Sequence, residues 1–388
     1  MIVRDELKAS IRTSLRRAQV TTVLGPRQCG KTTIAREIGD EAGAAYFDLE
    51  DPVSRKRLEE PMTALAGLRG VVVIDEAQLM PELYPILRVL SDRRPLPAKF
   101  LLTGSASPDL TRGVTESLAG RVEFIEMCGF SLTEVHAKAT RRLWWRGGFP
   151  RAFTAKTEAD SRSWQEAFIR TFLERDLRVM GIDAPPVRLR KFWTMIAHVH
   201  GGLWNAADLA RSLGVSSPTA QNYMDILTGS FMVRQLQPWF ENLGKRQTKA
   251  PKVFVRDSGL LHALLGVKTF SDLEGHPRLG FSWEGFVIEE IIKLVGERQV
   301  YFWSTHSGAE LDLLVFHRGK RIGVEIKYGD APGLTKSMHS ALDDLKLDRL
   351  FIGYPGIEAY ALPRGVEVLP FPALLDKFRK GAGRLKRA

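Results

Sequence analysis

Residues 25–32 read Gly-Pro-Arg-Gln-Cys-Gly-Lys-Thr and fit the pattern G-x-x-x-x-G-K-[ST] of a phosphate-binding loop. The two glycines let the backbone turn tightly, so that consecutive amide N–H groups point into one anion-binding cavity. The lysine can reach the β- and γ-phosphates, and the threonine hydroxyl can coordinate Mg²⁺. A β-branched run at 20–24 precedes the loop, and a helical stretch follows it from residue 33. The residues that we expect to hold the phosphates are Gly25, Gln28, Gly30, Lys31, Thr32 and Thr33.

A second motif lies at residues 71–76, which read Val-Val-Val-Ile-Asp-Glu. Four apolar residues ending in two acids indicate a buried parallel strand that presents its carboxylates at the edge where ligands bind. Asp75 can hold Mg²⁺ through water, and Glu76 is placed to deprotonate an attacking water. We therefore expect ATP and Mg²⁺ as cofactors, with Lys31 and Glu76 as catalytic residues and with Thr32 and Asp75 as metal ligands.

The composition is that of a globular protein with two or three domains. The chain has 388 residues, 44% of them hydrophobic and 26% charged, and a formal charge of +11 that favours a polyanionic partner. It contains no apolar run of membrane-spanning length and no signal peptide, and its two cysteines fit a reducing cytoplasm. Cys29, beside Lys31, fits either a reactive thiolate or inert packing.

The first third of the chain alternates strands and helices. We expect a helix at 5–17 and strands at 20–24, 45–50, 71–75, 99–105 and 122–127. This order predicts an α/β fold, a parallel sheet between two layers of helices, spanning residues 1–135. A helical lid at 136–185 would follow it.

The loop at 25–33, Asp-Glu-Ala-Gln at 75–78 and Leu-Leu-Thr-Gly-Ser at 101–105 resemble the AAA+ ATPases. They look closest to the prokaryotic branch of archaeal-type and STAND-like members. The resemblance implies that Thr103 or Ser105 senses the γ-phosphate, that Arg121 stabilises transferred charge and that Pro150 approaches the adenine. On the residues alone, Arg121 fits a surface salt bridge equally well, and Gly-Phe-Pro at 148–150 fits a plain turn.

A helix-turn-helix is expected in the middle of the chain, with helices at 205–213 and from 216 to about 227. Strands at 231–236 and 252–255 can pair as a β-wing, which completes a winged helix at 186–270. The side chains expected to face a DNA groove are Thr219, Gln221, Asn222 and Tyr223, and the wing-tip cations are Lys245, Arg246 and Lys249. In AAA+ relatives such a fold also serves as an internal packing element, so DNA contact stays open.

Two alternating strands at 310–316 and 321–327 are joined by a turn with Arg318-Gly319 at its tip. This register places Asp312 opposite Glu325 and Glu310 opposite Lys327, all on one face. Leu311, Leu313, Val324 and Ile326 would line the other face. Facing carboxylates repel each other, which favours a divalent cation between them.

Asp…Glu-x-Lys on a hairpin, after a helix that holds Glu284, resembles the PD-(D/E)xK nuclease fold. The resemblance implies a restriction-endonuclease-like α/β domain at 271–388 and a possible second Mg²⁺ site at Glu284, Asp312 and Glu325, with Lys327 activating water. Leu311 stands where the family has proline. The structural alternative is a solvated sheet face with a Glu310–Lys327 salt bridge.

Over nearly its full length the chain resembles prokaryotic ATPases that combine these three modules. The resemblance implies an ATP hydrolase that binds and remodels or processes nucleic acid, DNA in particular, through the winged helix and the basic C-terminal tail. Nuclease activity and a homo-oligomer are open possibilities, and no membrane partner is expected. Two alternatives remain: a STAND-like signalling switch whose C-terminal domain binds a partner, and a transcriptional regulator.

Overall fold

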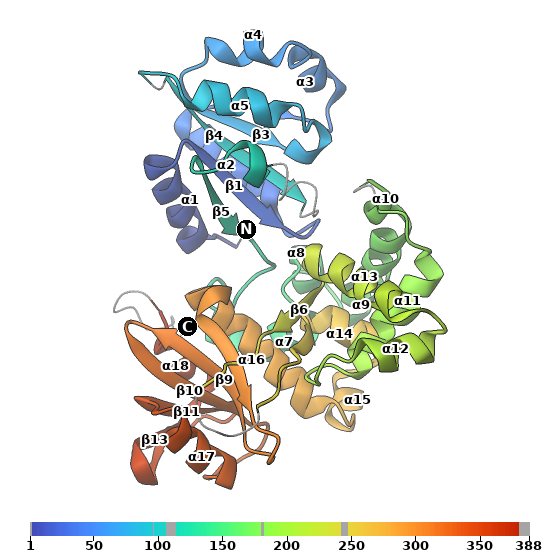
Figure 1. Ribbon diagram of the computed structural model, residues 1–388, viewed down its shortest axis with the longest axis vertical. Coiled ribbons are helices and arrows are strands. Elements are labelled where there is room, and N and C mark those ends of the chain that lie inside the picture. The colour runs from blue at the N-terminus through green and yellow to red at the C-terminus, as the bar shows by residue number, and fades with distance from the viewer. Residues whose placement is uncertain (1, 96, 106–113, 180–181, 242–246, 380–388) are drawn as a thin grey trace. The chain divides into compact units, whose positions relative to one another are not determined.

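The computed structural model describes residues 2–95, 97–105, 114–179, 182–241 and 247–379. The chain forms two compact units (Figure 1). Unit 1 comprises Met1–Gly129 with Gly229–Phe231, and unit 2 comprises Phe130–Thr228 with Met232–Ala388. Within the described ranges, no helix is both long and apolar enough to cross a bilayer.

Unit 1 is a three-layer α/β structure. Its elements are α1 (Asp5–Arg17), β1 (Val20–Gly25), α2 (Lys31–Ala42), β2 (Ala45–Asp48), α3 (Pro52–Arg57), α4 (Pro61–Ala66), β3 (Gly70–Asp75), η1 (Ala77–Leu79), α5 (Leu83–Ser91), β4 (Ala98–Ser105) and β5 (Val122–Glu126). The strands run parallel in the order β2-β3-β4-β1-β5. This confirms the parallel sheet expected from the sequence.

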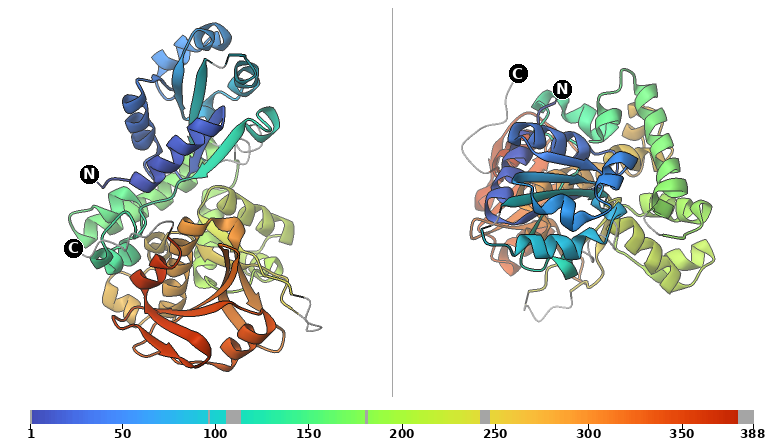
Figure 2. Two further views of the ribbon diagram at one scale, coloured as in Figure 1. Left: turned by 90° about the vertical axis from the view of Figure 1, so that its left-hand side faces the viewer. Right: turned by 90° about the horizontal axis from the view of Figure 1, so that it is seen from above.

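Helices cover both faces of this sheet (Figure 2). One face packs on α3, α4 and α5 through a cluster that includes Phe100, Leu58 and Leu87. On the other face, α2 lies so close to the sheet that a Cβ at Gly39 would touch Val73 at 3.4 Å. Most residues of β1, β3 and β4 are buried, and successive side chains of a strand point to opposite faces of the sheet. Both faces of the sheet are therefore buried.

Unit 2 begins with helices and ends in a mixed sheet. Its elements are η2 (Ala137–Ala139), α7 (Thr140–Arg146), α8 (Pro150–Phe153), α9 (Glu158–Thr171), the π-helix η3 (Phe172–Asp176), α10 (Leu177–Val179), α11 (Pro186–His198), α12 (Ala206–Leu213), α13 (Ser217–Gly229), β6 (Val233–Leu236), β7 (Lys252–Val255), α14 (Ser258–Leu264), α15 (Phe270–Glu274), α16 (Leu279–Val295), η4 (Glu297–Gln299), β8 (Val300–Ser304), β9 (Glu310–His317), β10 (Lys320–Ile326), α17 (Lys336–Asp344), β11 (Arg349–Tyr354), β12 (Tyr360–Leu362), η5 (Pro363–Gly365), β13 (Val366–Pro370) and α18 (Phe371–Asp376). The sheet order is β12-β13-β11-β10-β9-β8.

The helix pair and the β-hairpin expected at 205–255 are present. Asn205 caps α12, Gly214 ends it in the left-handed conformation, and β6 pairs antiparallel with β7. Tyr223, however, is buried against Phe192 and does not face outward. Gln221 is partly exposed and accepts from the Trp204 indole at 3.0 Å, so the expected groove-facing set was wrong for Tyr223.

The segment after β6 does not form the free wing expected from the sequence. Its backbone pairs with β8, the edge strand of the C-terminal sheet, at Gln237, Trp239 and Thr248. An edge strand leaves N–H and C=O groups unpaired, and this segment satisfies them. The wing-tip residues Lys245 and Arg246 lie outside the described residues.

The β9–β10 hairpin has the expected register, since Lys320 pairs with His317 and Val324 with Leu313. Arg318 and Gly319 at the tip both have positive φ, as a type I′ turn requires. A bulge in the β8–β9 pairing breaks the expected alternation, because Tyr301 pairs with Leu314 and Trp303 with Leu311. Leu311 and Leu314 therefore share the cluster under α17, and the shared face expected for Leu311 and Leu313 was wrong.

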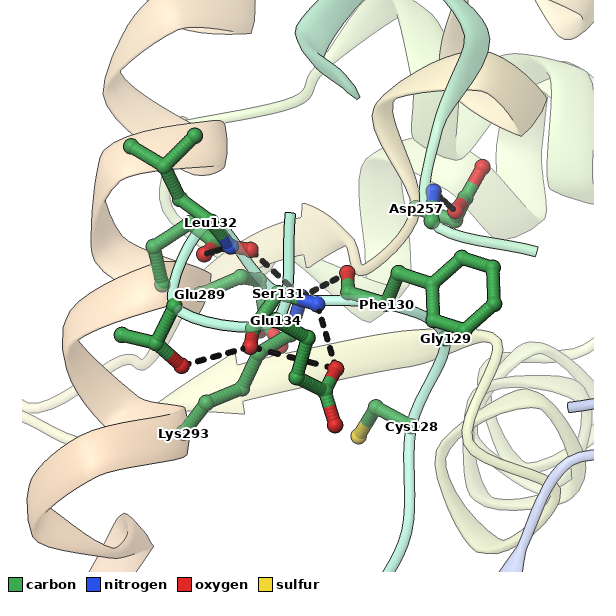
Figure 3. A network of polar contacts seen from close by, with 12 residues as sticks. Cys128, Gly129, Phe130, Ser131, Leu132, Glu134, Asp257, Glu289 and Lys293 are labelled. Carbon is green, nitrogen blue, oxygen red and sulfur yellow. Dashed lines mark hydrogen bonds and ion pairs between the residues drawn. The ribbon is translucent and has the colours of Figure 1, made fainter. Parts of the chain in front are cut away.

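Helix α16 holds unit 2 together. Glu289, in the middle of α16, receives Arg234 from β6 and, at 3.3 Å, Arg256 after β7. At the start of unit 2, the Leu132 N–H donates to Glu290 at 2.6 Å and Lys293 donates to the Phe130 carbonyl at 3.2 Å. Figure 3 shows this first segment lying against α16. The regions expected as lid, winged helix and nuclease-like domain thus form one compact unit.

Candidate functional site

The parallel register of unit 1 brings the two sequence motifs to one edge of the sheet. Gly25 pairs with Ser105 at the end of β4, and Ile74, just before Asp75, pairs with Leu102. Because all five strands run in the same direction, their carboxyl ends form a single edge. The phosphate-binding loop, Asp75 and Thr103 lie along this edge, where open α/β sheets bind ligands.

The loop is shaped for an anion. Gln28 and Gly30 have positive φ angles, of 63° and 101°. Gly25 is required for a reason that the motif does not reveal: a Cβ there would lie 2.0 Å from the Met127 carbonyl oxygen. The Lys31 ammonium is buried and donates to the carbonyls of Gly25 at 3.1 Å and Pro26 at 2.9 Å. The cation that should meet the phosphates is thus held inside the loop.

A buried hydrogen-bond network surrounds Asp75. One carboxylate oxygen accepts from the Thr103 hydroxyl and the other accepts from the Tyr46 hydroxyl at 2.8 Å. Burial, and then the Asp75 charge, raise the pKa of Tyr46, so the phenol stays a donor. Thr103 also accepts from the Glu76 N–H at 3.2 Å and thereby connects the two acidic residues. Thr103 thus lies beside Asp75 and Glu76, and its role as a γ-phosphate sensor stays a prediction. The side chain of Ser105 lies outside the described residues.

Glu76 itself adopts an uncommon conformation. Its φ of 55° is left-handed, which costs a residue other than glycine of the order of 1–3 kcal/mol and is concentrated at functional sites. Its carboxylate accepts a hydrogen bond from the Gln78 side chain. This contact fixes the carboxylate of the residue that we expect to act as base.

The donors at this edge fit a magnesium ion brought with a nucleotide. The Thr32 hydroxyl makes no hydrogen bond within the described part of the chain, so it is available as a ligand. Asp75 is a carboxylate at the end of a neighbouring strand, and oxygen donors of these two types are those that Mg²⁺ prefers. Thr32 and Asp75 would hold the ion.

Sequence reasoning missed two residues of this site. Tyr46 lies on β2, outside either motif, and only the neighbouring position of β2 and β3 brings it to Asp75. Arg4 donates to the backbone carbonyls of Cys128 at 3.1 Å and Gly129 at 3.2 Å, and to that of Cys29 in the loop at 3.4 Å. Arg4 precedes the first helix, and nothing in the local sequence distinguishes it.

Two expected site residues lie elsewhere. Arg121 precedes β5, and Val20 at the start of β1 pairs with Val122, so Arg121 is at the amino edge of the sheet. It forms a two-pronged ion pair with Asp92 at 2.7 and 2.8 Å. The structure therefore supports the alternative in which Arg121 forms a salt bridge within its own chain. Pro150 begins α8 of unit 2 and stays a prediction as an adenine contact.

The thiol of Cys29 is fully buried, and burial raises its pKa more than Lys31 and Arg4 lower it. It therefore stays protonated at neutral pH and can donate to the Met127 carbonyl at 3.6 Å. The packing alternative holds for Cys29, not the reactive thiolate.

The acidic cluster of the C-terminal region contains a cation of its own, Lys252 of β7. Its ammonium lies 3.2 Å from Glu284 and 2.5 Å from Glu310. Although burial lowers the pKa of Lys252, the charges of Glu284, Asp312 and Glu310 raise it above its ordinary value. Burial in turn raises the pKa of Glu284 to about 8, so Lys252 is the charged residue of the Lys252–Glu284 pair.

The remaining residues of the cluster are only partly occupied, since Glu325 Oε2 is buried without a hydrogen-bond partner among the described residues. Asp312 accepts from the Ile326 N–H at 2.8 Å, and Lys327 lies 2.6 Å from Glu325. Burial, and then the Asp312 charge, raise the pKa of Glu325 to about 7. Across the described ranges, no three Asp, Glu, His or Cys side chains lie close enough together to hold a metal. The donor set therefore does not fit the second Mg²⁺ site expected at Glu284, Asp312 and Glu325.

Three family models match consecutive parts of the chain. Residues 17–136 match an AAA domain, residues 137–271 a domain of unknown function (DUF8612) and residues 279–374 another (DUF4143). The uncharacterized proteins Rv2008c of Mycobacterium tuberculosis and Mb2031c of Mycobacterium bovis are both 49% identical over 375 residues. The match covers 97% of this chain and 85% of each relative.

Two solved structures align with parts of the chain at low sequence identity. The Walker-type ATPase PABY2304 of Pyrococcus abyssi aligns with a TM-score of 0.49 and 16% identity, over 68% of this chain and 96% of its own. The RuvB Holliday junction branch migration motor of Thermotoga maritima aligns with a TM-score of 0.30 and 18% identity, over 60% of this chain and 90% of its own.

Proposed function

The chain belongs to the same protein family as the two mycobacterial proteins and contains an AAA-type ATPase domain, and from this premise we propose that it is a Mg²⁺-dependent ATP hydrolase that binds and remodels nucleic acid, DNA in particular. The proposal places the protein in the cytoplasm. The observation that carries the ATPase part is the carboxyl edge of unit 1, where the phosphate-binding loop meets the Asp75–Thr103–Glu76 network.

Each residue at this edge has a chemical role. Lys31 leaves the loop carbonyls and neutralises the phosphates, while the loop amides bind their oxygens. Mg²⁺, when bound by Thr32 and Asp75, neutralises negative charge that develops on the phosphates. Glu76 accepts the proton of the attacking water once it leaves Gln78. Thr103 is hydrogen-bonded to both Asp75 and the Glu76 N–H. A movement of Asp75 when the site is occupied therefore also moves the backbone of Glu76.

The nucleic-acid part rests on charge and on the elements of unit 2. A formal charge of +11 favours polyanions, and α11, α12, α13 and the β6–β7 hairpin follow one another as in a winged helix. Of the side chains expected to face a DNA groove, Asn222 is exposed, and Thr219 and Gln221 are partly exposed. Of the expected wing-tip cations, Lys249 is described and exposed.

We propose that the C-terminal region binds nucleic acid without cleaving it. Helix α16, the antiparallel strands β8–β10, helix α17 and the parallel strand β11 follow in the order of a PD-(D/E)xK fold. Lys252, however, forms ion pairs with Glu284 and Glu310, and within the described residues no three potential metal ligands lie close enough together to hold an ion. The nuclease activity considered from the sequence is therefore not part of the proposal.

The test is the rate of ATP hydrolysis by the full chain with and without duplex and single-stranded DNA. We expect DNA to raise the rate, Lys31→Ala to abolish nucleotide binding, and Glu76→Gln to bind ATP while turnover falls by about 10²–10⁴. Turnover at the wild-type rate in Glu76→Gln would refute the ATPase site. A DNA-independent rate, with no DNA bound, would favour the signalling switch.

A further inference from the structure

Unit 2 contains a pocket of about 540 Å³ whose lining is strongly basic. It lies among η2, α7, the start of α9 and the start of α15, which Figure 1 labels in part. We call it the basic pocket. Its cations are Lys138, Arg141, Arg142, Arg146, Lys156 and Lys268, and Glu158 is its one acidic lining residue.

Glu158 leaves most of this charge unbalanced, because its carboxylate is already occupied. It accepts from Arg146 at 2.9 and 2.6 Å and from the Trp145 indole at 2.7 Å. Arg142 instead lies over the Phe153 ring, and burial followed by the Arg146 charge lowers its pKa. The pocket therefore concentrates like charges that repel one another.

Three lysines of the pocket, Lys138, Lys156 and Lys268, are exposed and form no ion pair within the described residues. The charge of Lys268 acts on Asp272, but the Asp272 carboxylate accepts from the Thr269 and Lys268 backbone and caps α15. Such a set of unpaired cations in a concave site has the chemistry of a polyanion site, since a bound anion would relieve their repulsion.

A second pocket, of about 870 Å³, adjoins the first and shares Lys138, Arg141 and Phe270 with it. We call it the aromatic pocket, since Trp144, Trp283, Tyr328 and Phe371 also line it. Glu274, Asp376 and Lys377 add charges of both signs.

Tyr328 is the platform of the aromatic pocket. Its ring is more than one-third exposed and rests on two buried indoles, with centroids 5.4 Å from Trp144 and 6.0 Å from Trp283. An aromatic residue that packs on buried neighbours and is still partly exposed offers a stacking surface for a planar base.

We propose that the two pockets form one binding site for single-stranded nucleic acid, with phosphates on the cations of the basic pocket and a base on Tyr328. Alternation of backbone charges and aromatic platforms is how proteins hold single strands. Pockets of this volume admit one nucleotide unit, whereas a duplex has its bases paired and stacked inside. This inference rests on the proposed nucleic-acid function and assigns it a location outside the winged helix.

The experiment measures binding of fluorescein-labelled oligo(dT) and of a duplex to the full chain by anisotropy, at several salt concentrations. One variant combines Lys138→Ala with Lys268→Ala. Its matched control combines Lys320→Ala with Lys336→Ala, which removes two exposed, unpaired cations that line neither pocket. We expect the pocket variant to flatten the log–log salt slope for oligo(dT) by about 1.4, since each phosphate contact on a single strand contributes about 0.7. The control should keep the wild-type slope.

The base contact has its own pair of variants. Tyr328→Ala should weaken oligo(dT) binding by about tenfold or more, and Tyr328→Phe should restore it, because stacking needs only the ring. The melting temperature of each variant is measured to check that the variant folds.

The outcomes separate the inference from the function beneath it. Oligo(dT) bound equally by wild type and both pocket variants would overturn the inference and leave the proposed function standing. Duplex bound as tightly as oligo(dT), or dTMP bound as tightly as the oligonucleotide, would overturn the single-strand assignment. No binding of any nucleic acid by the wild type would refute the proposed function, and the inference with it.

Discussion

Replacing Glu289 with glutamine should test what holds the hairpin β6–β7 to α16. Glu289 is buried and is the shared partner of Arg234 and Arg256, which come from either side of that hairpin. Glutamine keeps the size of the side chain and removes its charge. The change leaves two guanidinium groups with a neutral partner in a buried position, which is strongly destabilising.

The magnitude follows from the pKa of Glu289. Although burial opposes ionisation, Arg234 and Arg256 lower this pKa from 4.5 to about 2. The difference corresponds to about 3 kcal/mol of folding free energy at pH 7. Because the pKa is depressed in the folded state, this stabilisation is complete well above pH 4.5 and is lost as the pH falls towards 2. At pH 3.5 about 2 kcal/mol of it remains.

The assay is urea unfolding of the wild type and Glu289→Gln at pH 7 and pH 3.5, followed by circular dichroism. We expect the gap in unfolding free energy between them to be about 3–5 kcal/mol at pH 7 and to shrink by about 1 kcal/mol at pH 3.5. Glu297→Gln is the control, because Glu297 also pairs with Arg234, at 3.1 Å, but is 58% exposed. It should cost about 1 kcal/mol or less. A gap for Glu289→Gln that is as small as the control's, or that does not change with pH, would refute the reasoning.

Three further predictions concern unit 1. Gly25→Ala should abolish nucleotide binding and lower the melting temperature, because the new methyl would lie 2.0 Å from a backbone oxygen that follows β5; binding of a fluorescent ATP analogue checks this. In the native protein at pH 7, iodoacetamide should label Cys128 and spare Cys29, whose thiol is buried and has a raised pKa; peptide mass spectrometry would show the opposite if Cys29 is a reactive thiolate. Arg121→Ala should lower ATP turnover by no more than a few-fold, since its guanidinium pairs with Asp92 at the amino edge; a loss of about 10³ or more would restore its role as a finger.

The sequence determined the architecture of unit 1 and the central part of its site. The strand at 20–25 is rich in β-branched residues and the strand at 70–75 contains four consecutive apolar residues, and such runs are typical of strands buried on both faces. Since parallel strands end at a common edge, the positions of Lys31, Asp75 and Thr103 at one site followed from the strand order alone. The β9–β10 register was likewise local, because Gly319 fixes the turn and the turn fixes the pairing.

Only the tertiary structure decided which distant side chains complete each site. Tyr46 reaches Asp75, and Lys252 reaches Glu284, through contacts between residues about 30 positions apart. Periodicity describes which face of an element is apolar, but it does not describe which polar group will lie opposite it. Lys252 shows the consequence: it pairs with Glu284 and Glu310, two acids of the expected acidic cluster, and no periodicity in the sequence indicated this partner.

The surface of unit 2 was decided in the same way. Tyr223 follows Asn222 on α13, yet it is buried, because Phe192 of α11 packs on that side of the helix. The segment after β6 read as a free wing, but the open edge of β8 offered it hydrogen-bond partners that a wing in water lacks. Local sequence patterns thus determined the helices and strands and their order. Which side chains stay available for function was decided by burial and by competition for polar partners, and both depend on residues far along the chain.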